Sequence, residues 1–276
     1  MNLIIQGTDI ATPDLKHLAR LAGASAIEAI APSAFRLRDA AAHAEIAPFC
    51  EQSRLDFAFV PPERRLADMR LAVMDMDSTL ITIECIDEIA DMQGLKPQVA
   101  AITAAAMRGE LDYPQSLRER VALLKGLDAT ALVRVYNERV RLSPGAEIMI
   151  ARFRRLGIKT LLVSGGFTFF TERIRERLQL DYTRSNVLEI DDGRLTGRVT
   201  GEIVDADVKT QALLERRDEL GIGRAQVIGM GDGANDLKFM GESGVSIAYH
   251  AKPVVRAQAT HALSHVGLDG VLNLFN

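Results

Sequence analysis

The sequence predicts an α/β fold, in which a doubly wound parallel sheet carries an inserted helical cap and follows a small N-terminal α+β domain. Three observations support this prediction. Short apolar runs without polar alternation recur beyond residue 70, and segments of helical periodicity separate them. That order is typical of a parallel sheet with helices on both faces. A segment rich in Ala, Leu, Arg and Glu interrupts the order after the first run, and the first 70 residues follow a different pattern.

The composition narrows the class of protein. Of the 276 residues, 47% are hydrophobic and 25% are charged, as in globular chains that build their own core. The formal net charge of −4 gives no reason to expect a nucleic-acid partner. No apolar window approaches the length of about 18 residues that a membrane span needs, and the N-terminus lacks the regions of a secretory signal. With only Cys50 and Cys85 there is no disulfide framework, so we expect a cytoplasmic protein. The lack of a long apolar segment leads us to expect no membrane partner.

The first 67 residues predict a small α+β module. Its expected elements follow the order βαβαβ, with strands at 3–5, 26–30 and 55–60 and helices that begin at Thr12 and cover 40–49. The prolines at 61 and 62 then mark a linker. No residue of this module suggests chemistry. Binding of an amino acid, by analogy of fold, and a role in assembly or stability remain its two interpretations.

The catalytic core is expected to comprise residues 68–83 and 142–276. Four apolar runs are its predicted strands, at 71–74, 160–163, 225–230 and 245–248. Helical periodicity covers the segments 146–156, 168–178 and 208–220. The sequence Asp191-Asp192-Gly193 predicts a hairpin turn between two further strands. Each predicted parallel strand ends in small polar residues, and ligands bind beyond the carboxyl ends of such strands.

Residues 84–141 are predicted to form a helical cap. This segment shows several helical repeats and follows the first core strand directly. An insertion at that point lies above the crevice at the strand ends, where it can contact a bound ligand.

Two acidic motifs follow predicted strands. The run Asp75-Met76-Asp77-Ser78-Thr79 places two carboxylates two residues apart, and Asp232 and Asp236 lie in the loop Gly231-Asp232-Gly233-Ala234-Asn235-Asp236. Adjacent carboxylates repel unless a cation compensates them, and Mg²⁺ prefers such oxygen ligands. A carboxylate pair also suits a nucleophile with a general acid. Taken singly, each motif is also compatible with an ordinary turn or helix cap.

Two further features suit an oxyanion. Ser164-Gly165-Gly166 is expected to end a strand and open a helix, where a hydroxyl and free N–H groups make an anion site. Lys209 is expected to open another helix and could neutralise phosphate charge. Taken alone, Ser164 is better explained as an ordinary N-cap and Lys209 as a surface lysine. Together with the acidic motifs, they supply the groups that phosphoryl transfer requires.

In this order the motifs resemble the haloacid-dehalogenase superfamily of aspartate-nucleophile phosphatases, which implies a Rossmann-like core. The resemblance extends to its phosphoserine phosphatase family. Glu84, nine residues beyond Asp75, matches that family's glutamate, and Met107 with 109–113 matches its cap segment. Residues 116–124 are similar to the cap helix with its substrate-binding arginine, here Arg120. The likeness covers roughly residues 70–260, departs from the family at Tyr113 and leaves the N-terminal module uncovered.

The resemblance implies a set of catalytic and metal-binding roles. Asp75 is expected to be the nucleophile and Asp77 the general acid and base. Asp75, the Asp77 carbonyl and Asp232 are the expected Mg²⁺ ligands, with Asp236 next to them. The implied activity is hydrolysis of O-phospho-L-serine through an aspartyl-phosphate, the last step of phosphorylated serine biosynthesis.

The resemblance also implies how the substrate is bound. Residues that would hold the phosphate are Ser164, Gly165, Lys209 and Asn235. Glu84 would face the ammonium of phosphoserine, Arg120 would face its carboxylate as a bidentate fork, and Met107 would contribute an apolar contact. By spacing alone, a helix-terminal acid is the favoured interpretation of Glu84, and a solvated helix position that of Arg120.

Two other functions compete with this interpretation. The first is a phosphatase or phosphotransferase for another amino-alcohol phosphate, which would leave Arg120 without a carboxylate. The second is a regulatory protein that has lost catalysis, against which the intact Asp75, Asp77, Lys209 and Asp232 argue. The interpretation names a small-molecule substrate as the partner and allows a homodimer.

Overall fold

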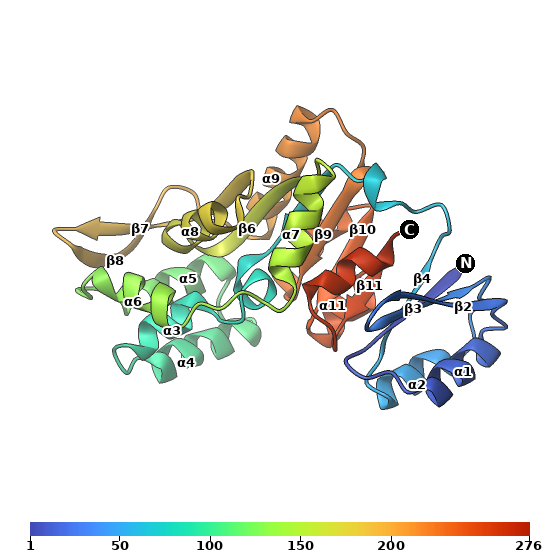
Figure 1. Cartoon of the computed structure of the whole chain (residues 1–276). Helices are drawn as coiled ribbons and strands as arrows, with labels where there is room; N and C mark the ends of the chain where they lie inside the picture. The colour runs from blue at the N-terminus through green and yellow to red at the C-terminus, as the bar shows by residue number, and fades with distance from the viewer.

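The computed structural model describes residues 1–276 and begins with a compact module on an antiparallel sheet of order β2-β3-β1-β4. Its elements are β1 (Asn2–Gln6), α1 (Thr12–Leu21), β2 (Ala26–Ala31), β3 (Ala34–Arg38), α2 (Ile46–Gln52) and β4 (Asp56–Val60). The helices α1 and α2 lie on one face of the sheet (Figure 1). Leu3 and Ile5 of β1 pack there against Leu18 of α1 in a small apolar cluster.

Two sequence-based expectations for this module are wrong. The order is βαββαβ, because β3 was not predicted. Its two arginines obscure the pattern of a buried strand, and they are stabilised by tertiary contacts, since Arg36 and Arg38 both pair with Glu28 of β2. The second helix begins at Ile46 rather than at residue 40, and the preceding segment is non-helical, with the backbone N–H groups of Ala40 and Ala41 donating to Met1 and Ala22.

The core is built on a seven-stranded sheet of order β11-β10-β9-β5-β6-β7-β8. The strands are β5 (Leu71–Met74), β6 (Lys159–Phe167), β7 (Tyr182–Asp191), β8 (Arg194–Thr200), β9 (Val227–Gly231), β10 (Val245–Tyr249) and β11 (His261–Leu263). All neighbours are parallel except the β7–β8 hairpin. The direction of winding reverses at β5, whose neighbours are β6 and β9, and this switch point is where doubly wound sheets bind ligands.

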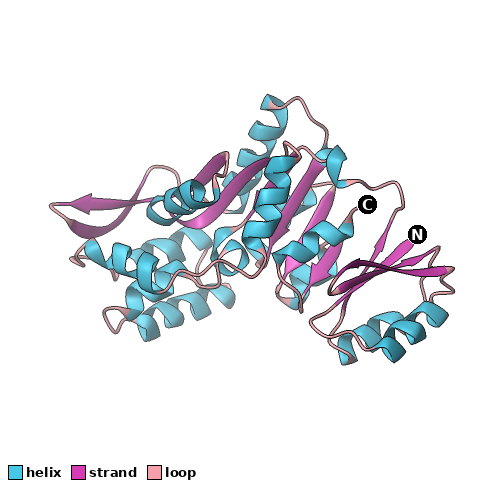
Figure 2. Cartoon of the chain, in the orientation of Figure 1, coloured by secondary structure: helices cyan, strands magenta, loops and turns pink.

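Helices cover both faces of this sheet (Figure 2). They are α7 (Ala146–Arg155), α8 (Thr168–Leu178), α9 (Ala206–Glu219), α10 (Leu237–Gly241) and α11 (Pro253–Gln258). Alternate side chains of β5 pack on opposite faces of the sheet. Ala72 and Met74 belong to the apolar cluster with α7 and α8. Leu71 and Val73 belong to the cluster with α9, α10 and α11. Burial on both faces explains why these strands lack polar alternation.

The segment after β5 forms four helices on one side of the core. These are α3 (Cys85–Asp91), α4 (Lys96–Met107), α5 (Tyr113–Ala122) and α6 (Thr130–Glu138). The loop between α5 and α6 adds to the edge of β8, where Gly126 N–H donates to the Leu195 carbonyl at 2.7 Å and Leu195 N–H donates to Leu127 at 2.8 Å. The backbone of the cap is therefore tied to the core hairpin.

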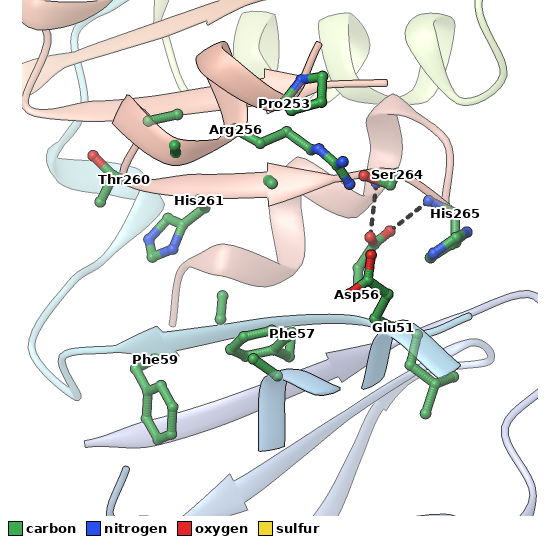
Figure 3. A pocket seen from close by; sticks show the side chains of 16 residues that line it. Glu51, Asp56, Phe57, Phe59, Pro253, Arg256, Thr260, His261, Ser264 and His265 are labelled. Carbon is green, nitrogen blue, oxygen red and sulfur yellow. Dashed lines mark hydrogen bonds between the residues drawn. The ribbon is translucent and has the colours of Figure 1, made fainter. Parts of the chain in front are cut away.

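The N-terminal module contacts the opposite side of the core, next to β11 (Figure 1). Asp56, at the start of β4, is buried and accepts the backbone N–H groups of Ser264 and His265 at 2.7 and 2.9 Å (Figure 3). It also accepts the N–H of Val266 at 3.1 Å. A cavity of about 580 Å³ lies beside these bonds, between β4 and the segment that contains α11 and β11. A carboxylate that accepts three amides fixes the module to the core.

None of the helices is both long and apolar enough to cross a membrane.

Candidate active site

The candidate site is a cavity of about 340 Å³ at the carboxyl ends of β5, β6 and β9, with cap helices forming its other wall. Its core wall contains Asp75, Asp77, Ser164, Gly165, Gly166, Phe167, Asp232, Gly233, Asn235 and Lys252. The remaining lining residues are Glu84, Ile86, Asp87, Thr103, Tyr113, Leu117 and Arg120. Three motifs that lie far apart in the sequence thus meet in one place, as the parallel sheet predicts.

Asp75 lies directly after β5 and is held rigidly. Its backbone N–H donates to Met230 of β9 at 3.0 Å, and its carboxylate accepts the N–H of Met76 at 2.8 Å. The residue is 6% exposed. Desolvation raises its pKa well above the usual range, and Asp236 adds to the rise while Lys209 opposes it. A fixed carboxylate beside a cation is well placed to act as a nucleophile.

Lys209, near the start of α9, is the internal counter-charge of the site. Its ammonium lies 2.9 Å from Asp75 and 2.8 Å from Asp236, and its side chain is 1% exposed. Burial opposes the charge on Lys209, but the two carboxylates raise its pKa above the ordinary value. The lysine is therefore charged, and it links the first acidic motif to the second.

The second acidic motif follows β9. Asp236 accepts the N–H of Gly233 at 3.1 Å in addition to its bond to Lys209. Asp232 accepts the hydroxyl of Thr79 at 3.1 Å, and desolvation together with repulsion by Asp236 raises its pKa to about 6. The loop needs Gly231, since a Cβ there would lie 2.5 Å from an Asp236 oxygen.

Asp75, Asp232 and Asp236 each place a carboxylate oxygen within 4.8 Å of the others. One lysine cannot balance three carboxylates, and the pKa values of Asp75 and Asp232 are raised first by desolvation and then by repulsion from Asp236. Hard oxygen donors in this arrangement fit Mg²⁺. The cluster suits Asp75 and Asp232 as ligands, because Lys209 and Met76 both bond the same oxygen of Asp75, whereas Asp236 uses one oxygen for Lys209 and the other for the N–H of Gly233.

Asp77 occupies the turn after Asp75 and faces the cap. One of its carboxylate oxygens is buried without a hydrogen-bond partner. Desolvation and repulsion by Glu84 raise its pKa to about 8, so the carboxyl is largely protonated at neutral pH. A protonated carboxyl that lines the cavity is suited to general acid catalysis.

The position of Ser164 differs from the expected one. Strand β6 continues to Phe167, so α8 begins four residues after Ser164 and the serine is not a helix cap. An irregularity in the pairing of β6 with β7, between Val163 and Phe167, lets the strand continue through the two glycines. The Ser164 hydroxyl instead accepts the N–H of Gly166 at 2.9 Å, inside the cavity wall.

Glu84 and Arg120 face the same cavity from the cap. Ser78, held at φ +55°, donates its hydroxyl to Glu84 at 2.7 Å and orients that carboxylate. Desolvation raises the pKa of Glu84, and the Ser78 bond, Lys252 and Arg120 oppose the rise. Arg120 has its Nε bonded only to the Ser116 carbonyl of its own helix, at 3.3 Å. A carboxylate and a guanidinium thus lie in one cavity without an ion pair between them.

The structure brings together all the predicted site residues but one. Met107 lies at the end of α4, is 72% exposed and does not line the cavity. Lys252 lines it and was not predicted, and its backbone N–H donates to the Asp232 carbonyl at 3.2 Å. Lys252 follows the carboxyl end of β10 by three residues, and this placement is the sequence signal that could have revealed it.

Fold and site together define a class of hydrolase. The family model described as haloacid dehalogenase-like hydrolase matches residues 72–241, which include most of β5, the segment 84–141 and both acidic motifs, and the chain belongs to this family. A second model, of a domain of unknown function named DUF4072, matches residues 3–46 in the N-terminal module.

Individual proteins are similar to this chain over most of its length. A protein of Polaromonas sp. named phosphoserine phosphatase is 57% identical over 218 residues, which are 77% of this chain and 92% of the relative. The crystal structure of a HAD family hydrolase from Salmonella enterica serovar Typhi covers 100% of this chain and 98% of its own, with a TM-score of 0.90 and 33% identity. The unliganded structure of a probable phosphoserine phosphatase from Vibrio cholerae covers 99% and 85%, with a TM-score of 0.87 and 37% identity.

Proposed function

We propose that this protein is a Mg²⁺-dependent phosphatase that hydrolyses O-phospho-L-serine to L-serine and phosphate. One observation carries the proposal: Asp75 and Asp77 share a cavity with an unpaired carboxylate, Glu84, and an unpaired guanidinium, Arg120. The substrate bears an ammonium and a carboxylate on the carbon skeleton that carries its phosphate, so these two cap residues complement it. The names of the relatives support the same substrate.

The first half of the reaction uses the two aspartates after β5. A carboxylate oxygen of Asp75 attacks phosphorus, and the bond from phosphorus to the serine oxygen breaks. Asp77, protonated because its pKa is raised to about 8, gives its proton to the departing oxygen. Serine leaves, and the phosphoryl group is bound to Asp75 as an aspartyl-phosphate.

The second half reverses the role of Asp77. Its carboxylate takes a proton from a water molecule, whose oxygen attacks phosphorus and releases phosphate and free Asp75. Ser164, the Gly165 N–H and Lys209 would hold the phosphate oxygens, and Asn235 lines the same cavity. Bound by Asp75, the Asp77 carbonyl and Asp232, Mg²⁺ would supply the positive charge that lets the dianionic phosphate approach these carboxylates.

The cap, residues 84–141, is assigned to substrate selection, and the contribution of Met107 requires the end of α4 to move toward the cavity. Every residue in the proposed mechanism comes from one chain, so a homodimer is not needed to complete the site.

The test is release of phosphate from a panel of phosphorylated metabolites in the presence of Mg²⁺. The panel contains O-phospho-L-serine, its D-enantiomer, phosphothreonine, phosphoethanolamine and sugar phosphates. We expect O-phospho-L-serine to have the highest kcat/KM and Asp75→Asn to abolish multiple turnover, while Asp218→Asn on the exposed surface of α9 leaves it unchanged. Preference for phosphoethanolamine would instead favour an amino-alcohol phosphatase, and turnover by Asp75→Asn would exclude Asp75 as the nucleophile.

A further inference from the structure

The helix that carries Arg120 is packed closely against the core at both of its ends. Tyr113, Leu117 and Arg120 lie on the face of α5 that lines the cavity, at the spacing i, i+4, i+7 of one helical face. Ala122 is two residues beyond Arg120, about 200° around the helix axis, and so faces away from the cavity. Displacement of α5 at Ala122 toward the cavity therefore moves Arg120 toward the bound substrate, and displacement in the opposite direction moves Arg120 away from it.

At the first end, Tyr113 lies against the phosphate-binding strand. Its hydroxyl donates to the Gly165 carbonyl at 3.3 Å, and the Asn186 amide donates to the same carbonyl at 2.8 Å. A Cβ at Gly165 would lie 2.0 Å from the Tyr113 hydroxyl oxygen, so only glycine admits the ring there. This end belongs to the site already described.

At the second end, α5 lies against Gly197 in β8, well away from the chemistry. A Cβ at Gly197 would lie 2.9 Å from Lys125 Cβ, 3.2 Å from the Ala122 carbonyl oxygen and 3.4 Å from Ala122 Cα. Two of these three atoms belong to backbone, which cannot rotate aside as a flexible side chain can.

Two neighbouring backbone bonds hold the same junction together: Gly126 N–H donates to the Leu195 carbonyl, and Leu195 N–H donates to the Leu127 carbonyl. An added methyl group at Gly197 therefore requires β8 and the end of α5 to move apart, and we expect α5 to shift.

We infer that Gly197 is a positioning residue for substrate specificity: the absence of a side chain there sets how far Arg120 reaches into the cavity. The inference rests on the proposed function, in which Arg120 binds the substrate carboxylate. A bidentate contact of a guanidinium with a carboxylate depends steeply on position. A small shift of α5 should thus weaken recognition of the carboxylate and leave the attack of Asp75 on phosphorus intact.

The experiment compares kcat/KM for O-phospho-L-serine with kcat/KM for phosphoethanolamine, which lacks the carboxylate. In Gly197→Ala we expect the ratio of the two to fall about tenfold. The matched control is Gly201→Ala, since Gly201 has a similar φ of +75° against +81° but nothing within 4 Å of its added Cβ. The control carries the same backbone strain without the contact, and its ratio should equal that of the unsubstituted protein.

A double substitution tests whether the effect passes through Arg120. In an Arg120→Ala background, Gly197→Ala should cause no further fall in the ratio. Equal losses on both substrates, a ratio like that of Gly201→Ala, or a further fall without Arg120 would each overturn the inference. If the unsubstituted protein shows no preference for O-phospho-L-serine, the proposed function itself fails, and the two failures are thereby distinguished.

A second pair of variants serves if Gly197→Ala does not fold. Arg194 donates to the Gly126 carbonyl of the cap at 2.8 Å, whereas Arg198 on the same hairpin bonds only to Glu189. Arg194→Ala should lower the ratio about threefold and Arg198→Ala should not. The same ratio for both variants would show that the junction does not position α5.

Discussion

Lys209 is the residue whose removal should disturb the site most, and Lys209→Met is the variant that measures this. Its ammonium lies within 3 Å of both Asp75 and Asp236, and its side chain is 1% exposed. Methionine has a similar length but no charge, so two buried carboxylates lose their common partner. Breaking one buried ion pair from one side costs about 3–5 kcal/mol. Protonation of Asp75, whose pKa is already raised, limits the total to about that range.

The assay is urea unfolding in EDTA at pH 7.5, and we expect the free energy of unfolding to fall by about 3–5 kcal/mol. Lys238→Met is the matched control, because Lys238 forms a similar 2.7 Å pair with Asp207 between exposed side chains, where such pairs contribute below about 1 kcal/mol. Adding Asp236→Asn to Lys209→Met should recover at least about 1 kcal/mol, since one uncompensated charge is removed. A loss no greater than that of Lys238→Met would refute the assignment of Lys209 as the counter-charge of the site.

Three further predictions concern specificity, metal and pH. Arg120→Ala should lower kcat/KM about 10- to 100-fold for O-phospho-L-serine but only slightly for phosphoethanolamine, because a charged hydrogen bond contributes about 1.5–3 kcal/mol; equal losses would contradict its role. EDTA should abolish turnover and Mg²⁺ should restore it and raise the urea midpoint, as expected for a cation that binds the folded state alone; a rate independent of metal would reject the Mg²⁺ site. Burial, with Arg64, lowers the pKa of His261 to about 4 from 6.5, so the unfolded state binds the extra proton between these values. The free energy of unfolding should fall by up to about 1.4 kcal/mol per pH unit on acidification from pH 6.5 to about 4, and it should fall by less in His261→Gln. Identical pH profiles for the two proteins would show that His261 does not contribute.

The core strands and the acidic motifs could be predicted because their signals are local. The run 71–74 is apolar at every position, as expected for a short strand buried on both faces. Asp75 and Asp77 follow that strand directly, so their meeting with Asp232 follows from the parallel sheet alone. Prediction of Glu84 and Arg120 relied on family resemblance, since nothing in their spacing distinguishes them from surface residues of a helix.

The remaining features depend on tertiary contacts. Strand β3 is stabilised by pairing with β1 and by Glu28, and neither contact is visible in its own five residues. Strand β11 has three residues, which is too short for any period to show. Ser164 was expected at a helix start because glycines usually end a strand, whereas the shifted pairing with β7 carries β6 onward to Phe167.

Each of the two outermost strands of the core sheet is contacted by a segment from outside the core. On one side, β8 bonds through Leu195 to Gly126 and Leu127 of the cap. On the other side, β11 lies beside β4, and Asp56 binds the amides that follow it. An open strand edge is a template on which other chains can add, and aggregation begins there. The insertion and the N-terminal module, whatever else they do, each contact one such strand, so neither outer strand of the core sheet is left fully open to another chain.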